Sequence, residues 1–126
     1  MFQIFTKANT RIYNYFFIII FLYTLFKKII LDPGIGFGKN LKHNLTLISK
    51  ISLFHSLGFP ILIGTSRKRF ISQISGKNDS KDRIGGTLAS VLFLLSQGVQ
   101  IFRVHNVNEV KQGILVFRKI LSNFTN

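Results

Sequence analysis

Hydrophobic and polar positions alternate in blocks from residue 29 onward, and the blocks predict β-strands that are each followed by an α-helix. Short apolar runs, typical of buried parallel strands, occupy residues 29–31, 61–63 and 99–104. Apolar residues recur at helical spacing between and after these runs, over about 41–54, 66–74, 88–95 and 110–121. The pattern therefore predicts an α/β fold with a parallel sheet.

The predicted helices have recognisable ends. Gly58 and Gly98 follow the last apolar positions of two of them, as glycine does at helix C-termini. Ser66 is a candidate N-cap for the helix that follows it. Asn106, with Glu109 three residues later, predicts a capping box at the start of the last helix.

The polar residues that end the predicted strands recur at regular intervals. Asp32, Ser66 and Arg103 lie 34 and 37 residues apart, and each interval is the size of one βα unit. The chain holds three such units, whereas a closed eight-unit barrel takes about 250 residues. The sequence therefore predicts either a small open sheet or part of a barrel.

Residues 1–28 differ from the rest of the chain and are left unassigned. An apolar stretch at 16–26 lies between Arg11 and Lys27, and it is shorter than the roughly 20 residues that a membrane-spanning helix needs. We expect a buried helix or strand there, with membrane association through 16–26 as the alternative. No small-residue cleavage site follows the stretch, so we do not expect a signal peptide.

Composition narrows the classes of function without choosing among them. The 126 residues carry 17 Lys+Arg against four Asp+Glu, a formal charge of +13, which favours phosphorylated ligands, nucleic acid or anionic membranes. The lysines are scattered, however, and AT-biased coding would also enrich Lys, Asn, Ile and Phe. The lack of cysteine excludes a disulfide scaffold, a thiolate metal site and a cysteine nucleophile. A membrane-tethered basic protein and a nucleic-acid-binding protein remain the rival interpretations.

Candidate chemistry follows each predicted strand, where parallel βα folds bind their ligands. The first cluster runs from Asp32 to Lys39 and contains glycines at 34, 36 and 38. Asp32 could accept hydrogen bonds from the N–H and amino groups of a heterocycle, and Phe37 offers an aromatic face. The alternative is that Asp32 only caps a turn.

The second and third clusters are basic. Gly64-Thr65-Ser66-Arg67-Lys68-Arg69 sets cationic side chains at a helix N-terminus, an arrangement that attracts anions and is unfavourable without one. Arg103 and His105 project from the same side of an extended segment and could clamp a phosphate or pyrophosphate. The alternative for the second cluster is a solvated basic turn. The alternative for the third is that His105 ends a strand by bonding to a backbone group. His43 and His55 are predicted to be surface residues.

Four segments together resemble dihydropteroate synthase, in that family's order and spacing. They are Leu31-Asp32-Pro33-Gly34-Ile35-Gly36-Phe37-Gly38-Lys39, Gly64-Thr65-Ser66-Arg67-Lys68, Gly86-Thr87-Leu88-Ala89-Ser90 and Arg103-Val104-His105-Asn106-Val107. The resemblance covers about residues 29–121. It implies a (β/α)8 TIM-type barrel that condenses p-aminobenzoate with a hydroxymethyl-dihydropterin pyrophosphate, giving dihydropteroate and pyrophosphate, with Mg²⁺ as cofactor.

The resemblance also implies roles for particular residues. Asp32, Gly36 and Lys68 are expected at the pterin, with Lys68 bonding its ring. Phe37 and Ser66 are expected at the p-aminobenzoate, and Arg103 and His105 are expected to bind pyrophosphate. Residue 106 is Asn where the family usually has Asp, so a carboxylate role there is not expected.

Nothing in residues 1–28 resembles the family's first five βα units, which hold its metal-binding Asn. We therefore expect an incomplete barrel: residues 29–124 form a partial pterin-binding domain equivalent to units six to eight. The fragment is expected to be inactive alone, with a separate chain as the possible source of the other units. The full-length family is implied to be homodimeric and cytoplasmic.

Overall fold

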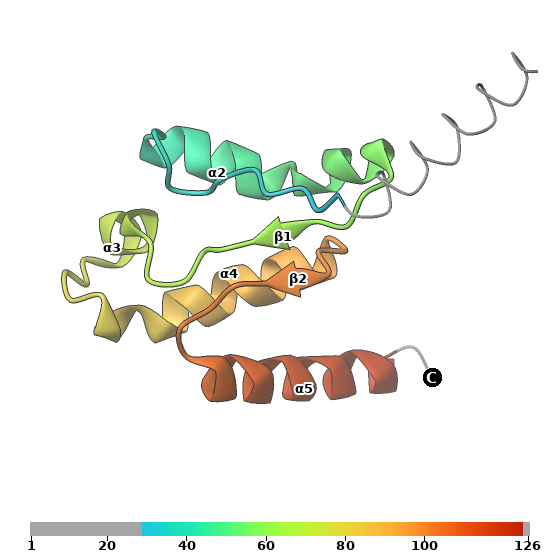
Figure 1. The fold of residues 1–126 in the computed structure, drawn as a ribbon. Coiled ribbons are helices and arrows are strands. Elements are labelled where there is room, and N and C mark those ends of the chain that lie inside the picture. The colour runs from blue at the N-terminus through green and yellow to red at the C-terminus, as the bar shows by residue number, and fades with distance from the viewer. Residues whose placement is uncertain (1–28, 125–126) are drawn as a thin grey trace, which may run out of the picture.

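The computed structural model describes residues 29–124, which alternate between short extended segments and helices (Figure 1). Residues 1–28, where a buried helix or strand or a membrane association through 16–26 was expected, lie outside the described residues. The elements in chain order are α2 (Leu41–Ser49), the 3-10 helix η1 (Ile51–Leu57), β1 (Leu62–Ile63), α3 (Arg69–Ser75), the 3-10 helix η2 (Lys81–Arg83), α4 (Ile84–Ser96), β2 (Ile101–Phe102) and α5 (Val107–Phe124).

The extended segments are parallel. Strand β1 pairs with β2, with Leu62 opposite Ile101, and Leu31 forms a parallel bridge with Ile61 on the other side. The three predicted strand positions are therefore neighbours, in the order Leu31, β1, β2. The central run at 61–63 is paired throughout, whereas within residues 29–124 the runs at 29–31 and 99–104 are paired only at Leu31 and at β2.

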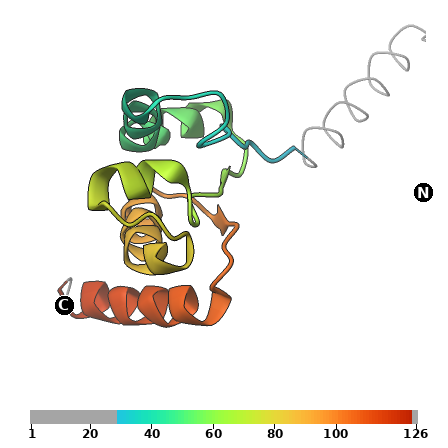
Figure 2. The same cartoon turned by 90° about the vertical axis from the view of Figure 1, so that its left-hand side faces the viewer.

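The helices lie on one side of the strands. In the view of Figure 2, α2, α4 and α5 form a row beside the extended segments. Burial alternates along β1 in agreement with this arrangement, because Ile63 is buried while Leu62 is half-buried. One face of the sheet is thus packed against helices.

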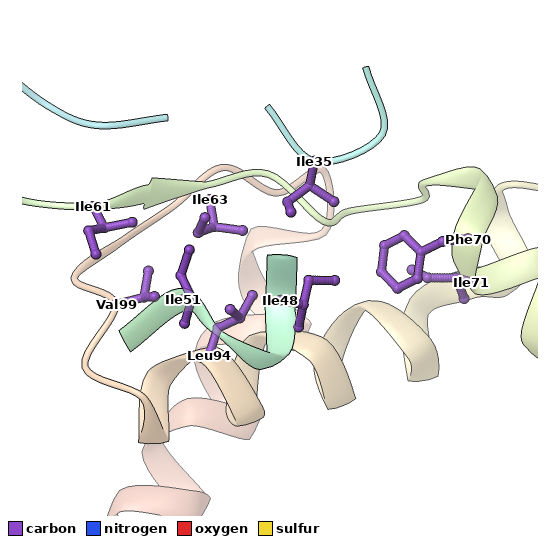
Figure 3. Close-up of a cluster of buried hydrophobic side chains, with 9 residues drawn as sticks. All are labelled: Ile35, Ile48, Ile51, Ile61, Ile63, Phe70, Ile71, Leu94 and Val99. Carbon is purple, nitrogen blue, oxygen red and sulfur yellow. The ribbon is translucent and has the colours of Figure 1, made fainter. Parts of the chain in front are cut away.

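The core fills the space between the strands and the helices. Nine buried side chains form it (Figure 3), and they come from the loop after Leu31, α2, η1, β1, α3, α4 and the segments that flank the strands: Ile35, Ile48, Ile51, Ile61, Ile63, Phe70, Ile71, Leu94 and Val99. Helix α5 packs outside this cluster on α4, where a Cβ on Gly113 would come 2.5 Å from Leu88 Cδ1. Glycine is needed there for close helix packing.

One predicted helix start differs from the structure, and another agrees with it. Helix α3 begins at Arg69 rather than Ser66, because residues 65–68 form a turn closed by a 3.2 Å hydrogen bond from Lys68 N to Thr65 O. Helix α5 begins at Val107, directly after Asn106 as predicted, and Asn106 Oδ1 accepts hydrogen bonds from the Arg67 side chain.

The other helix boundaries follow the pattern more closely. The predicted helix over 41–54 is α2 continued by η1, and it ends at Gly58 in the left-handed conformation, with φ +74°. Gly98, with φ +85°, follows the end of α4. No helix within residues 29–124 has both the length and the apolar character to cross a membrane.

Candidate functional site

A cavity of about 520 Å³ opens at the carboxyl ends of β1 and β2. Its volume lies within the range of small-molecule pockets, about 300–1,000 Å³. Three loops contribute its lining, one after each extended segment: Phe37, Gly64, Ser66, Lys68, Arg103, Val104 and His105.

The residues predicted from the sequence converge on this cavity. Five of the seven line it: Phe37, Ser66, Lys68, Arg103 and His105. The other two adjoin it, because Asp32 is ion-paired with Arg103 and Gly36 packs against Lys68. The three predicted clusters therefore meet at one edge of the sheet, although they are separated along the chain.

Asp32 has two partners. Its Oδ1 accepts a 2.9 Å hydrogen bond from Gly34 N, which is the turn-capping arrangement considered for it. Its Oδ2 lies 3.3 Å from Arg103 Nη2. Since both side chains are exposed, this ion pair contributes little to the stability of the fold. It links the loop after Leu31 to the loop after β2.

The glycine-rich loop is held by side chains that the sequence analysis did not single out. Lys39 Nζ donates hydrogen bonds to Gly34 O (2.8 Å) and Phe37 O (3.0 Å). Asn44, a buried residue of α2, accepts a 2.8 Å hydrogen bond from Gly36 N. Asn44 stands out only because its amide is buried among backbone groups, and the sequence does not show this burial.

Lys68 and Phe37 contact each other across the cavity wall. Lys68 Nζ lies 4.0 Å from the centroid of the Phe37 ring, a cation–π contact. Gly36 has φ +84°, and a Cβ there would come 2.9 Å from Lys68 Cδ. Glycine at this position thus permits both the loop conformation and the course of the Lys68 side chain.

The turn at residues 65–68 is anchored to α4. Thr65 Oγ1 accepts a hydrogen bond from Ser90 Oγ (2.9 Å), and Arg67 N donates to Thr87 Oγ1 (3.1 Å). Thr65 and Thr87 are both buried. Arg67 is in the left-handed conformation, with φ +58°.

The Arg67 side chain crosses to the loop after β2. Its Nη2 and Nε donate to Asn106 Oδ1 at 2.8 and 3.3 Å. Its carbonyl oxygen accepts a 2.9 Å hydrogen bond from Arg83 Nη1. Arg67 therefore joins three segments around the cavity, a role that the sequence analysis missed because nothing in a basic run identifies which arginine turns inward.

The two basic residues after β2 have different surroundings. Arg103 lies against Gly64, where a Cβ would be 3.3 Å from Arg103 Nη2. His105 is bonded to Ser66, whose Oγ lies 3.2 Å from His105 N and 3.0 Å from His105 Nδ1. The cavity thus presents guanidinium, ammonium and imidazole groups together, a set suited to anionic oxygens.

The described residues do not suit a metal ion. Within residues 29–124 there is no group of three or more His, Asp or Glu side chains that could hold one. Asp32 is the carboxylate linked to the cavity, and its two oxygens are engaged by Gly34 N and Arg103. Mg²⁺, which prefers carboxylate oxygens and water, has no ready-made site here.

The prediction that His43 and His55 are surface residues holds for His43 and is wrong for His55. His43 is exposed, but His55 is half-buried and its Nε2 lies 2.8 Å from Gln97 O. A side chain at residue 98 would collide with it, since a Cβ on Gly98 would lie 2.9 Å from His55 Nε2. His55 therefore ties η1 to the end of α4.

Comparison with known proteins identifies the family of this chain. The model of the pterin binding enzyme family matches residues 25–105, which is more than half of the chain. The chain belongs to this family. The comparisons give no support to the membrane-tethered or nucleic-acid-binding interpretations.

The most similar curated relatives include dihydropteroate synthases. That of Escherichia coli K12 is 42% identical over 96 residues, covering 76% of this chain and 34% of the relative. That of Bacillus subtilis is 44% identical over 84 residues, covering 67% and 29%. The chain thus spans about a third of the length of these relatives.

Solved structures give the same result. Dihydropteroate synthase of Thermus thermophilus in complex with 6HMPPP is 41% identical, with a TM-score of 0.71, and the match covers 73% of this chain and 37% of that one. The structure of the same enzyme in complex with 4-aminobenzoate has a TM-score of 0.70 at 42% identity, covering 71% and 35%. The described residues thus share the fold of a part of these enzymes.

Proposed function

We propose that the chain supplies the last three βα units of a (β/α)8 dihydropteroate synthase barrel. In that barrel, p-aminobenzoate condenses with 6-hydroxymethyl-7,8-dihydropterin pyrophosphate to give dihydropteroate and pyrophosphate. The observation that supports this most strongly is the convergence of Phe37, Ser66, Lys68, Arg103 and His105 on one cavity at the strand ends. Residues 29–124 would form this partial domain, in the cytoplasm.

The chemistry of the cavity suits the proposed substrates. Asp32 would accept hydrogen bonds from the amino-pyrimidine edge of the pterin, while Lys68 bonds the ring beside Gly36. Phe37 and the turn at Ser66 would form the side that takes p-aminobenzoate. Arg103 and His105 would hold the pyrophosphate and stabilise the negative charge that develops as it departs. The arylamine is itself a nucleophile, so the proposal needs no general base.

The remaining units would have to close the sheet. Leu31 and β2 have unpaired outer sides within residues 29–124, and open strand edges readily pair with further strands. We propose that units one to five, from a separate chain, pair with both edges and hold the Mg²⁺, which these residues do not suit. Alone, the chain is expected to be inactive; the completed barrel would be homodimeric, as implied for the family.

The experiment is a complementation assay. The chain is purified alone and after co-expression with the first five βα units of the Escherichia coli enzyme, and pyrophosphate release is measured with both substrates and Mg²⁺. We expect turnover only in the complemented complex. The Arg103→Gln variant should lose activity about 100-fold, since its group would stabilise the leaving pyrophosphate, whereas Arg118→Gln on the exposed surface of α5 should not.

Two results would contradict the proposal. Robust turnover by the chain alone would refute the incomplete barrel. A stable complex that binds neither substrate would refute the assignment of the cavity to the pterin pyrophosphate and p-aminobenzoate.

A further inference from the structure

Arg67 is a half-buried residue between two residues that line the cavity, Ser66 and Lys68. Its backbone has φ +58°, and within residues 29–124 it is the only residue other than glycine with a positive φ. The left-handed conformation costs such a residue free energy, and it persists only where the surroundings hold it. Strained conformations cluster at functional sites, so the groups that hold Arg67 are candidates for a role in ligand binding.

Three contacts hold Arg67, one for each part of the residue. Its N–H donates to Thr87 Oγ1 at 3.1 Å, and its carbonyl oxygen accepts from Arg83 Nη1 at 2.9 Å. Its side chain donates from Nη2 and Nε to Asn106 Oδ1, at 2.8 and 3.3 Å. Thr87 and Arg83 belong to α4 and η2, whereas Asn106 lies in the segment after β2.

Asn106 suits this contact by its chemistry and its place in the chain. Arginine has donors but no acceptor, so the amide must turn its oxygen and not its NH2 group toward Arg67. A hydrogen bond from a charged donor is stronger than one between neutral groups. Asn106 is half-buried and directly follows His105. The contact therefore joins the turn at residues 65–68 to the other basic side of the cavity.

We propose that Asn106 is a positioning residue, which acts through Arg67 to hold the turn at residues 65–68 in the form that presents Ser66 and Lys68 to the cavity. The positive φ of Arg67 sets the relative directions of the residues before and after it. A change of φ to an ordinary negative value would redirect Ser66 and Lys68 together. Asn106 fulfils this role without contacting a ligand.

The contacts of the two flanking residues agree with this role. Ser66 Oγ accepts a 3.2 Å hydrogen bond from His105 N, on the side of the cavity formed after β2. Lys68 Nζ lies 4.0 Å from the centroid of the Phe37 ring, on the side formed by the glycine-rich loop. The turn thus reaches both sides of the cavity, and its form at Arg67 decides whether both contacts are made.

The ligands in this inference rest on the proposed function, whereas the geometry does not. Under that function Ser66 and Lys68 contact p-aminobenzoate and the pterin, and Arg103 and His105 hold the departing pyrophosphate. Loss of the Asn106 contact would therefore weaken the binding of both substrates. The stabilisation of the leaving group would remain.

Nuclear magnetic resonance on the full chain tests the positioning role without a ligand. The ring of Phe37 should shift the ε-methylene protons of Lys68 upfield in the unaltered chain. Asn106→Ala should lose most of this shift. Asn106→Asp keeps an acceptor oxygen and should keep the shift, as should Asn108→Ala at an exposed position of α5. An unchanged shift in a folded Asn106→Ala variant, or equal loss in Asn106→Asp, would overturn the proposal.

The exchange of the Arg67 Nε–H with water gives a readout that needs no variant. This group donates to Asn106 and is half-buried, so it should exchange about five-fold more slowly than the Nε–H of exposed Arg69. Equal exchange rates would overturn the proposal, even if Asn106→Ala failed to fold.

Kinetics of the complemented complex give the functional readout. In Asn106→Ala the KM for each substrate should rise about five-fold with kcat unchanged, because the turn binds the substrates equally before and during the reaction. Asn108→Ala should change neither constant. A fall in kcat without a rise in KM would overturn the inference that the turn positions substrates. If the Lys68 shift depends on Asn106 but the complex is inactive, the proposed function fails and the positioning role of Asn106 stands.

Discussion

Replacement of Gly36 by alanine should displace Lys68, and replacement of Gly38 provides a matched control. Both glycines have positive φ, +84° and +58°. A Cβ on Gly36 would lie 2.9 Å from Lys68 Cδ, whereas a Cβ on Gly38 would meet nothing within 4 Å. The two variants therefore share the backbone cost and differ in the collision with Lys68.

The magnitudes follow from these geometries. A left-handed conformation costs an alanine about 1–2 kcal/mol, and the reduced freedom of the unfolded chain returns about 0.4–1 kcal/mol. Each variant should thus lose about 1 kcal/mol in the free energy of unfolding. Gly36→Ala should lose a further 0.5–1 kcal/mol, roughly the value of the cation–π contact between Lys68 and Phe37. The flexible Lys68 side chain should swing away, which is easier than moving the backbone.

Urea denaturation measures the stability of both variants, and NMR reports on Lys68 directly. The ring current of Phe37 should shift the ε-methylene protons of Lys68 upfield in the unaltered chain. This shift should disappear in Gly36→Ala and persist in Gly38→Ala. Loss of the shift in both variants, or its retention in both, would refute the argument that Gly36 sets the course of Lys68.

Two further predictions concern the scaffold of the site. Gly113→Ala should lower the free energy of unfolding by about 1–3 kcal/mol, because its Cβ would overlap Leu88. Gly85→Ala in α4, whose Cβ would meet no atom within 4 Å, should raise it by about 0.5–1 kcal/mol. Thermal denaturation of both variants tests these opposite changes. Asn44→Ala should cost about 1–3 kcal/mol in urea denaturation because the Gly36 N–H loses its acceptor and Asn40 O loses a donor. Ser49→Ala, which removes only an exposed hydrogen bond within the same helix, should cost less; equal losses would contradict this reason.

The sequence was sufficient to predict which residues meet at the cavity. In a parallel βα protein the carboxyl ends of the strands share one edge, so Asp32, Lys68 and Arg103 could be brought together from strand order alone. Their convergence therefore needed only the alternation of apolar runs and helical spacing. The order of the extended segments also follows from this alternation, since consecutive units tend to be neighbours.

Contacts between distant segments could not be predicted in the same way. The positive φ of Arg67 depends on Thr87 and Arg83 in another part of the chain, and a local rule made Ser66 a helix cap instead of a partner of His105. The paired lengths of the runs at 29–31 and 99–104 were also overestimated, because pairing depends on which neighbour faces each residue and not on the hydrophobicity of the run.

The contact between Asp32 and Arg103 has a consequence for ligand selectivity. Each group has an oppositely charged partner within the chain, 3.3 Å away, so under the proposed function a ligand that replaces both partners would leave neither charge unpaired. A free diphosphate would satisfy Arg103 and leave the carboxylate alone, and a bare heterocycle would do the reverse. A compound that joins the heterocycle to the diphosphate pairs both charges at once. Its binding free energy should therefore exceed the sum of those of the two separate parts.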